Sequence, residues 1–278
     1  MASTPYNQRE TGFRLSQAAK KIRNSVFIKG KLVVLKTYLT TPPVADPVLR
    51  GEIKEFSPGS RFRLLKKIAT IDWDKLPQGL FVTLTYPDKL ASAETKTTTM
   101  HRHHWIRYME KYLCEKVPIL WRKEQQRRKS GDHVGLHVQH YHLCIFTDKL
   151  LPHELVRDWW RRTIKAVGPL ATDVKRMDSG EHAAFYLAKY LSKRESSPSL
   201  DYVSYLTKPG RAWGFHRPQL LPYHPTDSFV GLTEEQYEAI LDETRPLWSD
   251  GSARTWQSFT LLGQQAEEAA KKIYEILA

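Results

Sequence analysis

The sequence contains only two cysteines, Cys114 and Cys144, and their spacing matches no zinc-binding motif. Both lie among apolar residues, so we expect reduced, structural thiols, as is typical of an intracellular protein. No apolar run approaches the ~18 residues that a membrane-spanning helix needs, and the N-terminus has no signal-peptide core. These absences predict a cytoplasmic protein without a membrane partner.

Acidic residues are in deficit, with 30 Asp and Glu against 43 Lys and Arg in 278 residues. Basic side chains gain free energy against phosphates by releasing condensed counterions, so nucleic acid is the first candidate partner. A Gly-x-x-x-x-Gly-Lys-Ser/Thr phosphate-binding loop is missing as well, which excludes a P-loop motor within this sequence. We therefore look for a nucleic-acid site that needs no nucleotide cofactor.

Composition shifts divide the chain into three predicted parts: a basic N-terminal segment (1–50), an α/β domain (51–224) and a C-terminal helical extension (225–278). Residues 1 to about 25 are expected to form a flexible basic arm. Apolar periodicity predicts helices over 59–70, 101–114, 152–168, 182–193 and 264–277, and strands over 31–36, 80–86, 117–126, 139–146 and 172–177. The mixture of elements predicts an α/β, or α+β, fold.

Two histidines stand two apart in the strand-forming run Gln139-His140-Tyr141-His142-Leu143-Cys144-Ile145-Phe146. Successive side chains of a strand point to opposite faces, so His140 and His142 share one face with Cys144 and Phe146. Two neighbouring imidazoles are typical ligands of one divalent ion, and two solvated histidines at a polar strand end are the alternative.

A third ligand is expected from the strand before this one. Glu124 has the parity of Leu120 and Arg122, and an antiparallel hairpin could bring its carboxylate beside the two imidazoles. A Glu-His-His set suits Mg²⁺ or Mn²⁺ and leaves positions open for phosphate oxygens. Asp132 and His137 compete for this position, although His137 has the wrong parity if the strand extends that far back. We prefer Glu124.

The predicted helix 182–193 carries Tyr186-Leu187-Ala188-Lys189-Tyr190-Leu191-Ser192-Lys193. At ~100° per residue Tyr186 and Tyr190 fall on one face, with Lys189 and Lys193 in the adjacent stripe. A surface helix with packed tyrosines and solvated lysines is the alternative.

Other basic and aromatic residues are candidates for DNA binding. The helix 59–70 leaves Arg61 and Arg63 for solvent or phosphate, and the stretch 210–217 offers Arg211, Trp213 and Arg217 for phosphate contact and base stacking, or else as an aromatic cluster under a loop. His101, His103 and His104 have no carboxylate beside them and are expected to be solvated.

Three ordered motifs resemble the HUH endonuclease superfamily, and within it the rolling-circle replication initiators. They are Phe81-Val82-Thr83-Leu84-Thr85-Tyr86-Pro87, then His140-Tyr141-His142, then the Tyr186 to Lys193 string. The paired tyrosines look like those of the two-tyrosine gene A proteins of small DNA phages. The resemblance covers roughly residues 57 to 217. Relaxases, which usually have a third histidine and carry their tyrosine near the N-terminus, fit the order less well.

This resemblance implies a ferredoxin-like fold whose metal-binding histidines lie on a central antiparallel strand, with helices behind the sheet. It implies an endonuclease and strand transferase in a bacterial host that nicks and joins single-stranded DNA, at an origin that can form a hairpin. Tyr186 or Tyr190 would be the nucleophile, Lys189 and Lys193 would stabilise charge on the phosphate, and Mg²⁺ or Mn²⁺ would be the cofactor. A phage or plasmid initiator of this kind would borrow a host helicase and polymerase.

Two alternatives stay open from the sequence. A HUH transposase would use the same residues on the ends of a mobile element. A non-enzymatic DNA-binding repressor would use the basic helices alone.

Overall fold

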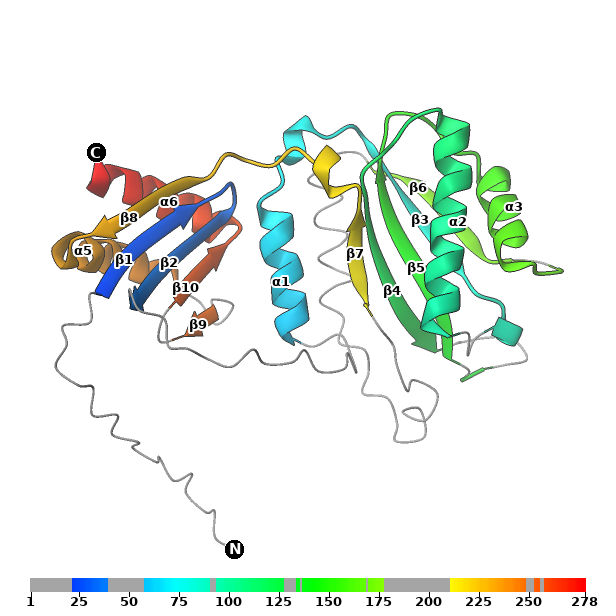
Figure 1. The fold of residues 1–278 in the computed structure, drawn as a ribbon, viewed down its shortest axis with the longest axis horizontal. Helices are drawn as coiled ribbons and strands as arrows, with labels where there is room; N and C mark the ends of the chain where they lie inside the picture. The colour runs from blue at the N-terminus through cyan, green and yellow to red at the C-terminus, as the bar shows by residue number, and fades with distance from the viewer. Residues whose placement is uncertain are drawn as a thin grey trace, which may run out of the picture.

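The computed structural model describes residues 22–39, 58–90, 94–127, 134–135, 137–168, 170–177, 211–248, 253–255 and 258–278. Two antiparallel five-stranded sheets lie side by side, each accompanied by helices (Figure 1). The predicted mixed α/β class is confirmed.

The first sheet has the strand order β6-β3-β5-β4-β7. Its strands are β3 (Gly79–Thr85), β4 (Ile119–Arg127), β5 (His137–Phe146), β6 (Thr172–Arg176) and β7 (Trp213–His216). Helix α2 (Thr95–Leu113) follows β3, and α3 (His153–Ile164) follows β5. The chain order β3-α2-β4-β5-α3-β6 and the spatial order β6-β3-β5-β4 are those of the ferredoxin-like arrangement, with β7 added at the β4 edge. The predicted fold and the central position of β5 are confirmed.

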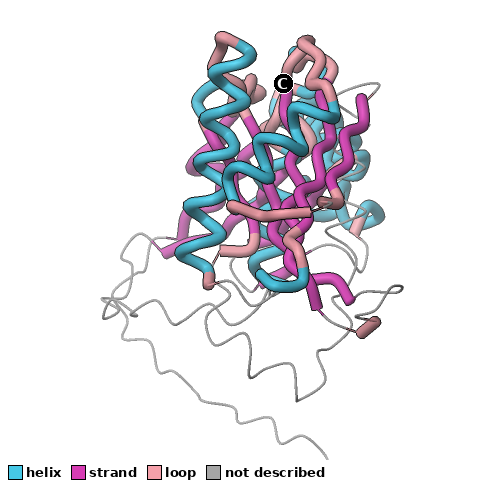
Figure 2. The backbone as a smooth tube through the Cα atoms, turned by 90° about the vertical axis from the view of Figure 1, so that its right-hand side faces the viewer, coloured by secondary structure: helices cyan, strands magenta, loops and turns pink. Residues whose placement is uncertain are grey.

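Both α2 and α3 cover one face of this sheet (Figure 2). Alternate β5 residues, Tyr141, Leu143 and Ile145, point into the core beneath these helices, together with Trp105 and Trp160. The predicted alternation of β5 is therefore observed, and its even-numbered residues, from His140 to Phe146, belong to the other face.

The other face is only partly covered. Helix α1 (Pro58–Ala69) places Leu64 and Ile68 against Phe81, Cys144 and Phe146 in a second core cluster. The spacing of Leu64 and Ile68 gives one apolar helical stripe, which is why the helix lies on the apolar end of the strands. The histidine end of β5 lies beyond this cluster.

The second sheet has the order β8-β1-β2-β10-β9. Its strands are β1 (Ile22–Ile28), β2 (Leu32–Leu39), β8 (Asp227–Leu232), β9 (Ala253–Thr255) and β10 (Ser258–Leu262). Helices α5 (Glu234–Thr244) and α6 (Gln264–Leu277) share its core, which includes Val26, Leu35, Ile240 and Ile273. An N-terminal hairpin and the C-terminal segment therefore form one unit.

The predicted parts 1–50 and 225–278 thus contribute to the same sheet, although the predicted limits at 50 and 224 stay a prediction. The expected flexible arm to about residue 25 is wrong at its end, because Ser25 is fully buried in β1. The C-terminal extension has the predicted helix 264–277, and its strands β8 and β10 were not expected.

The two units meet along the β1–β2 turn. The Lys31 amide donates to the Ala69 carbonyl at the end of α1 (3.0 Å), and the His224 amide donates to the Thr70 carbonyl (3.0 Å). Gly30 has a φ of 55°, and a Cβ there would lie 2.3 Å from Cδ2 of His224. The turn therefore fits directly against the segment that links the units.

Two side-chain predictions are wrong. His101 is buried, not solvated, because its ring packs against Tyr86 and Trp160, and Nδ1 lies 3.2 Å from the Tyr86 hydroxyl. Cys114 is exposed at the left-handed end of α2, whereas Cys144 is buried as expected; both are free thiols. Among the described helices, none is long and apolar enough to cross a membrane.

Candidate functional site

The open end of the first sheet brings together polar side chains from three neighbouring strands. In the β3–β5 register Thr83 lies opposite His142 and Thr85 opposite His140. In the β4–β5 register Arg122 lies opposite His142 and Glu124 opposite His140. Directly opposed residues of antiparallel strands point to the same face. All six side chains therefore belong to the face that α2 and α3 leave uncovered.

Each imidazole is held by a threonine hydroxyl. The Thr83 Oγ1–His142 Nδ1 distance is 3.1 Å, and the Thr85 Oγ1–His140 Nδ1 distance is 2.9 Å. The rings are nearly parallel, at 5° with centroids 6.2 Å apart, and Phe81 stacks on the His142 ring. Since both Nδ1 atoms bond to the protein, the two Nε2 atoms are the ring nitrogens that can serve as ligands.

Glu124 lies beside both histidines, as the predicted hairpin requires. Its Oε1 is 3.0 Å from His142 Nε2, and its Oε2 is 3.6 Å from Arg122 Nη1. Burial acts to raise the pKa of this carboxyl, but the hydrogen bond and charge of His142 and the charges of Arg122 and His140 outweigh it. The pKa of Glu124 is therefore lowered, and the group is an anion.

The chemistry of this set fits a divalent cation. It offers two imidazole nitrogens and one ionised carboxylate, and the threonines give the imidazoles the outer hydrogen bonds that fix ligand orientation. Within the described ranges, no three His, Cys, Asp or Glu side chains already form a closed metal-binding cluster. Glu124 instead bonds to His142, so coordination would require that the carboxylate turn and the His142 Nε2 lone pair be exposed.

The competing ligands are not supported by the described residues. Position 137 is the first of β5, so the strand does extend that far back and its parity differs from that of His140. Asp132 lies outside the described residues, as do Tyr186, Lys189, Tyr190 and Lys193. The roles predicted for these four residues stay predictions.

The five candidate DNA-binding residues lie in different surroundings. Arg63 and Arg211 are exposed, and Arg61 is half-buried. The Trp213 indole donates to the Ser60 hydroxyl of α1 (3.0 Å) and packs edge-on against Phe215. The aromatic residue therefore joins β7 to α1, close to the alternative of an aromatic cluster.

Arg217 is bound to a buried carboxylate. Its Nε and Nη2 both donate to Glu110 of α2, the latter at 3.0 Å, and His216 and Lys116 contact the same carboxylate at 3.3 and 3.2 Å. This cluster fixes the end of β7 to α2. A contact of Arg217 with DNA stays a prediction.

Three residues of this face were not predicted from the sequence. Thr83 and Thr85 were placed on one face of their strand, but only the β3–β5 register pairs them with the imidazoles. Arg122 shares the parity of Glu124, and that parity was the one available signal. Strand register is a long-range property, so the sequence does not show which side chains become neighbours.

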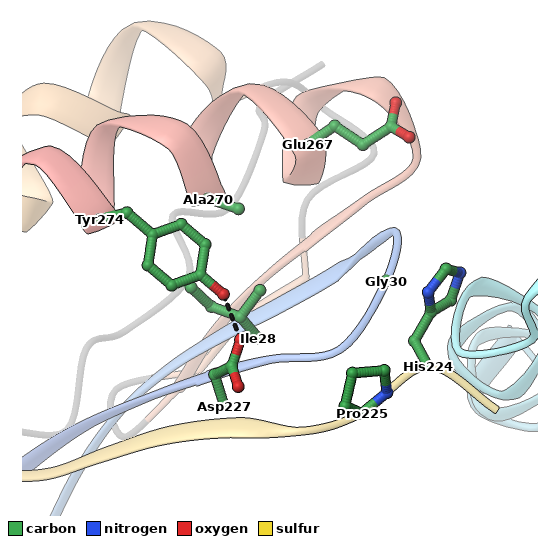
Figure 3. Close-up of a pocket in the computed structure, with 8 residues that line it drawn as sticks. All are labelled: Ile28, Gly30, His224, Pro225, Asp227, Glu267, Ala270 and Tyr274. Atoms are coloured by element: carbon green, nitrogen blue, oxygen red, sulfur yellow. Dashed lines mark hydrogen bonds between the residues drawn. The ribbon is translucent and has the colours of Figure 1, made fainter.

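A pocket of about 300 Å³ lies in the second unit (Figure 3). It is lined by Ile28, Gly30, His224, Pro225, Asp227, Glu267, Ala270 and Tyr274. The Tyr274 hydroxyl donates to the Asp227 carboxylate, which raises the pKa of Tyr274 to about 12. Asp227 and Glu267 point away from each other in Figure 3, so their carboxylates do not converge on one ligand. The open face of the first sheet is the stronger candidate.

Comparison with known proteins points the same way. Residues 79–195 match the model of a family of replication-associated proteins, the ORF2 family. Among curated proteins and among solved structures, nothing matches this chain. The matched residues run from β3 past β6, and so contain the two histidines, Glu124 and the threonines. Similarity to a replication-associated family over the segment that forms this site supports a replication initiator.

Proposed function

We propose that this chain is a rolling-circle replication initiator that nicks and joins single-stranded DNA through a phosphotyrosine linkage, in the manner of HUH endonucleases. The observation that carries the proposal is the open face of the first sheet. There, two parallel imidazoles, each anchored by a threonine, stand beside an ionised carboxylate within the segment that matches a replication-associated family.

His140, His142 and Glu124 are the residues that would hold Mg²⁺ or Mn²⁺. When bound, such an ion supplies Lewis-acid polarisation of a phosphate oxygen. Thr83 and Thr85 keep the imidazole planes parallel, so that both Nε2 atoms are presented together. The half-coverage by α1 leaves the histidine end of the sheet accessible to a DNA strand.

Tyr186 or Tyr190 is the proposed nucleophile. A phenol has a pKa of about 10, so it must lose its proton as it attacks. The tyrosine oxygen forms a bond to phosphorus, the bond from phosphorus to the 3′ oxygen breaks, and that oxygen takes up a proton to become a free 3′-OH. The 5′ phosphate stays on the enzyme. Lys189 and Lys193 are proposed to stabilise the negative charge on the phosphate.

Joining reverses these steps. A 3′-OH attacks the phosphotyrosine, the bond to the tyrosine oxygen breaks, and the phenol recovers its proton. A second tyrosine allows a new cut while the first still holds DNA. Because bond energy is conserved in each exchange, no nucleotide cofactor is required.

The direct test is covalent trapping. The chain is incubated with Mn²⁺ and labelled single-stranded oligonucleotides that tile its replicon, and adducts are resolved by denaturing electrophoresis. We expect an adduct that Tyr186→Phe combined with Tyr190→Phe abolishes, and that His140→Ala combined with His142→Ala reduces by at least about a hundredfold.

The matched control is Tyr108→Phe, which alters an exposed tyrosine of α2 on the opposite side of the sheet and should leave the adduct unchanged. An adduct that survives the double phenylalanine change would contradict the tyrosine assignment. Metal-independent binding of DNA, with no cleavage of any oligonucleotide, would instead favour a repressor.

A further inference from the structure

Arg122 lies at the centre of the proposed site, although nothing in the proposed chemistry uses it. It is opposite His142 on one side and opposite Trp213 on the other, and its side chain is only 3% exposed. A cation is costly to bury unless an anion compensates it. The anion beside it is Glu124, whose Oε2 lies 3.6 Å from Nη1.

Glu124 is therefore shared between two neighbours. One oxygen faces the His142 imidazole and the other faces the Arg122 guanidinium. With neutral imidazoles, the formal charge of His140, His142, Glu124 and Arg122 together is zero. Mg²⁺ and Mn²⁺ prefer anionic oxygen ligands, and a guanidinium beside the only carboxylate of the set opposes their binding.

We propose that Arg122 is a positioning residue that neutralises Glu124 and so makes binding of the divalent cation depend on DNA. This inference rests on the proposed function. A DNA phosphate restores the missing negative charge, which favours the cation, and the guanidinium favours the phosphate. By linkage, the cation and the DNA then raise each other's affinity by the same factor.

The consequence is order in the reaction. A site that holds its cation weakly without DNA becomes complete only when a strand lies across the open face. Arg122 thereby couples completion of the site to the presence of its substrate. It contacts a proposed ligand, and its effect passes through Glu124.

The test measures Mn²⁺ binding by electron paramagnetic resonance, with and without an oligothymidylate that carries no origin. Wild type should bind Mn²⁺ weakly alone and at least about tenfold more tightly with the oligonucleotide. Arg122→Gln removes the charge and keeps a polar side chain, so it should tighten binding of Mn²⁺ alone by about tenfold and reduce the effect of DNA.

Two further variants guard against misfolding. Arg122→Lys keeps the charge and should behave as wild type, whereas Arg122→Met keeps an apolar stem beside Trp213 and should behave as Arg122→Gln. Each variant is first compared with wild type by circular dichroism. If neither the Gln nor the Met variant tightens binding of Mn²⁺ alone, or if DNA leaves the wild-type affinity unchanged, the inference fails.

Failure of the proposed function gives a different result. If wild type binds no Mn²⁺ with or without DNA, or if His140→Ala combined with His142→Ala leaves the affinity unchanged, the metal site itself is wrong. Binding that needs the histidines but ignores Arg122 overturns the coupling alone.

Discussion

At the residue scale, the two threonines of β3 decide how the histidines are presented. A hydroxyl can donate to or accept from an imidazole nitrogen, so each threonine can hold its ring in either tautomer. The Oγ1–Nδ1 contacts of 3.1 and 2.9 Å therefore survive when His142 exchanges its bond to Glu124 for another ligand. This makes Thr83 and Thr85 orienting partners of the site.

We predict that Thr85→Val, which keeps the shape and removes the hydroxyl, lowers Mn²⁺ affinity in the presence of DNA by about 10- to 100-fold, as loss of an outer-shell partner does. Thr163→Val is the matched control, because this buried α3 hydroxyl has no hydrogen-bond partner among the described residues. Calorimetric titration of both variants distinguishes the two cases. Equal affinities would show that Thr85 does not orient His140.

Glu110 provides a prediction about pH. Burial acts to raise the pKa of this carboxyl, but hydrogen bonds from Arg217 and Lys116 and the Arg217 charge outweigh it and lower the pKa to about 2. A lowered folded-state pKa means that the stabilisation is fully present above the ordinary value of 4.5 and is lost as the pH falls through about 2.

Glu110→Gln should therefore cost on the order of 2 to 3 kcal/mol of unfolding free energy at pH 7. The difference from wild type should shrink between pH 4.5 and pH 2, where wild type loses this contribution. Urea unfolding at several pH values measures both effects. A difference that stays constant across this range would mean that the carboxylate's ionisation does not stabilise the fold.

At the element scale, β7 is a short edge strand held by contacts at both of its ends. Its Arg217 end is tied to α2 through Glu110, and Trp213 at its start donates to Ser60 of α1. In between, Trp121 of β4 lies across Gly214, and the Arg102 guanidinium stacks on Trp121 at 3.6 Å. Glycine is required at position 214 because the indole occupies the space of a side chain.

Gly214→Ala should displace β7, since the added Cβ would lie 2.7 Å from Cζ2 of Trp121. Overpacking of this kind costs about 1 to 3 kcal/mol. Gly59→Ala is the control, because a Cβ there meets only Arg63 Nη1 at 3.7 Å, and helix propensity favours alanine. Thermal unfolding and hydrogen exchange of the β7 amides report the two outcomes. Unchanged protection of β7 would mean that Trp121 moves aside.

Elements with a strong local pattern were predictable and long-range pairings were not. The helix 264–277 and the strand around Phe81 follow from periodicity and β-branched content, and they are observed with nearly the predicted bounds. The strand β1 begins with the polar run Arg23-Asn24-Ser25, which carries no apolar alternation. Its place in a sheet comes from β8, far along the chain, so only the fold reveals it.

The candidate site shows the same limit. Parity alone predicted that His140, His142 and Glu124 share a face, and the structure brings them together. Parity does not reveal how neighbouring strands are aligned, so the pairing of Arg122 with His142 was not foreseen. His101 was misjudged for a related reason, since its burial depends on Tyr86 and Trp160 from other elements.

At the scale of the whole molecule, two units meet at a small junction. The family match covers strands β3 to β6 of the first sheet, and the second sheet lies outside the matched residues. Their contact includes two backbone hydrogen bonds, to Ala69 and Thr70, and the packing of Gly30 against His224. Lys29 and Lys67, one from each unit, lie over the Tyr223 ring at 5.5 and 4.4 Å.

Gly30→Ala should loosen this junction without unfolding either sheet. The change imposes a side chain at a φ of 55° and places its Cβ 2.3 Å from His224 Cδ2, so the imidazole must leave. We expect faster hydrogen exchange at the Lys31 and His224 amides, which donate across the junction, and a larger radius of gyration by small-angle scattering. The core amides of β1 and β5 should keep their protection.

Gly231→Ala separates the two causes, because Gly231 also has a positive φ, 78°, but a Cβ there meets nothing within 4 Å. This control should lose about 1 kcal/mol of stability from backbone strain and leave the junction intact. Combining Gly30→Ala with His224→Ala should remove the collision and restore protection at Lys31. If Gly30→Ala and Gly231→Ala behave alike, the packing of Gly30 against His224 does not hold the units together, and the backbone bonds to Ala69 and Thr70 are sufficient.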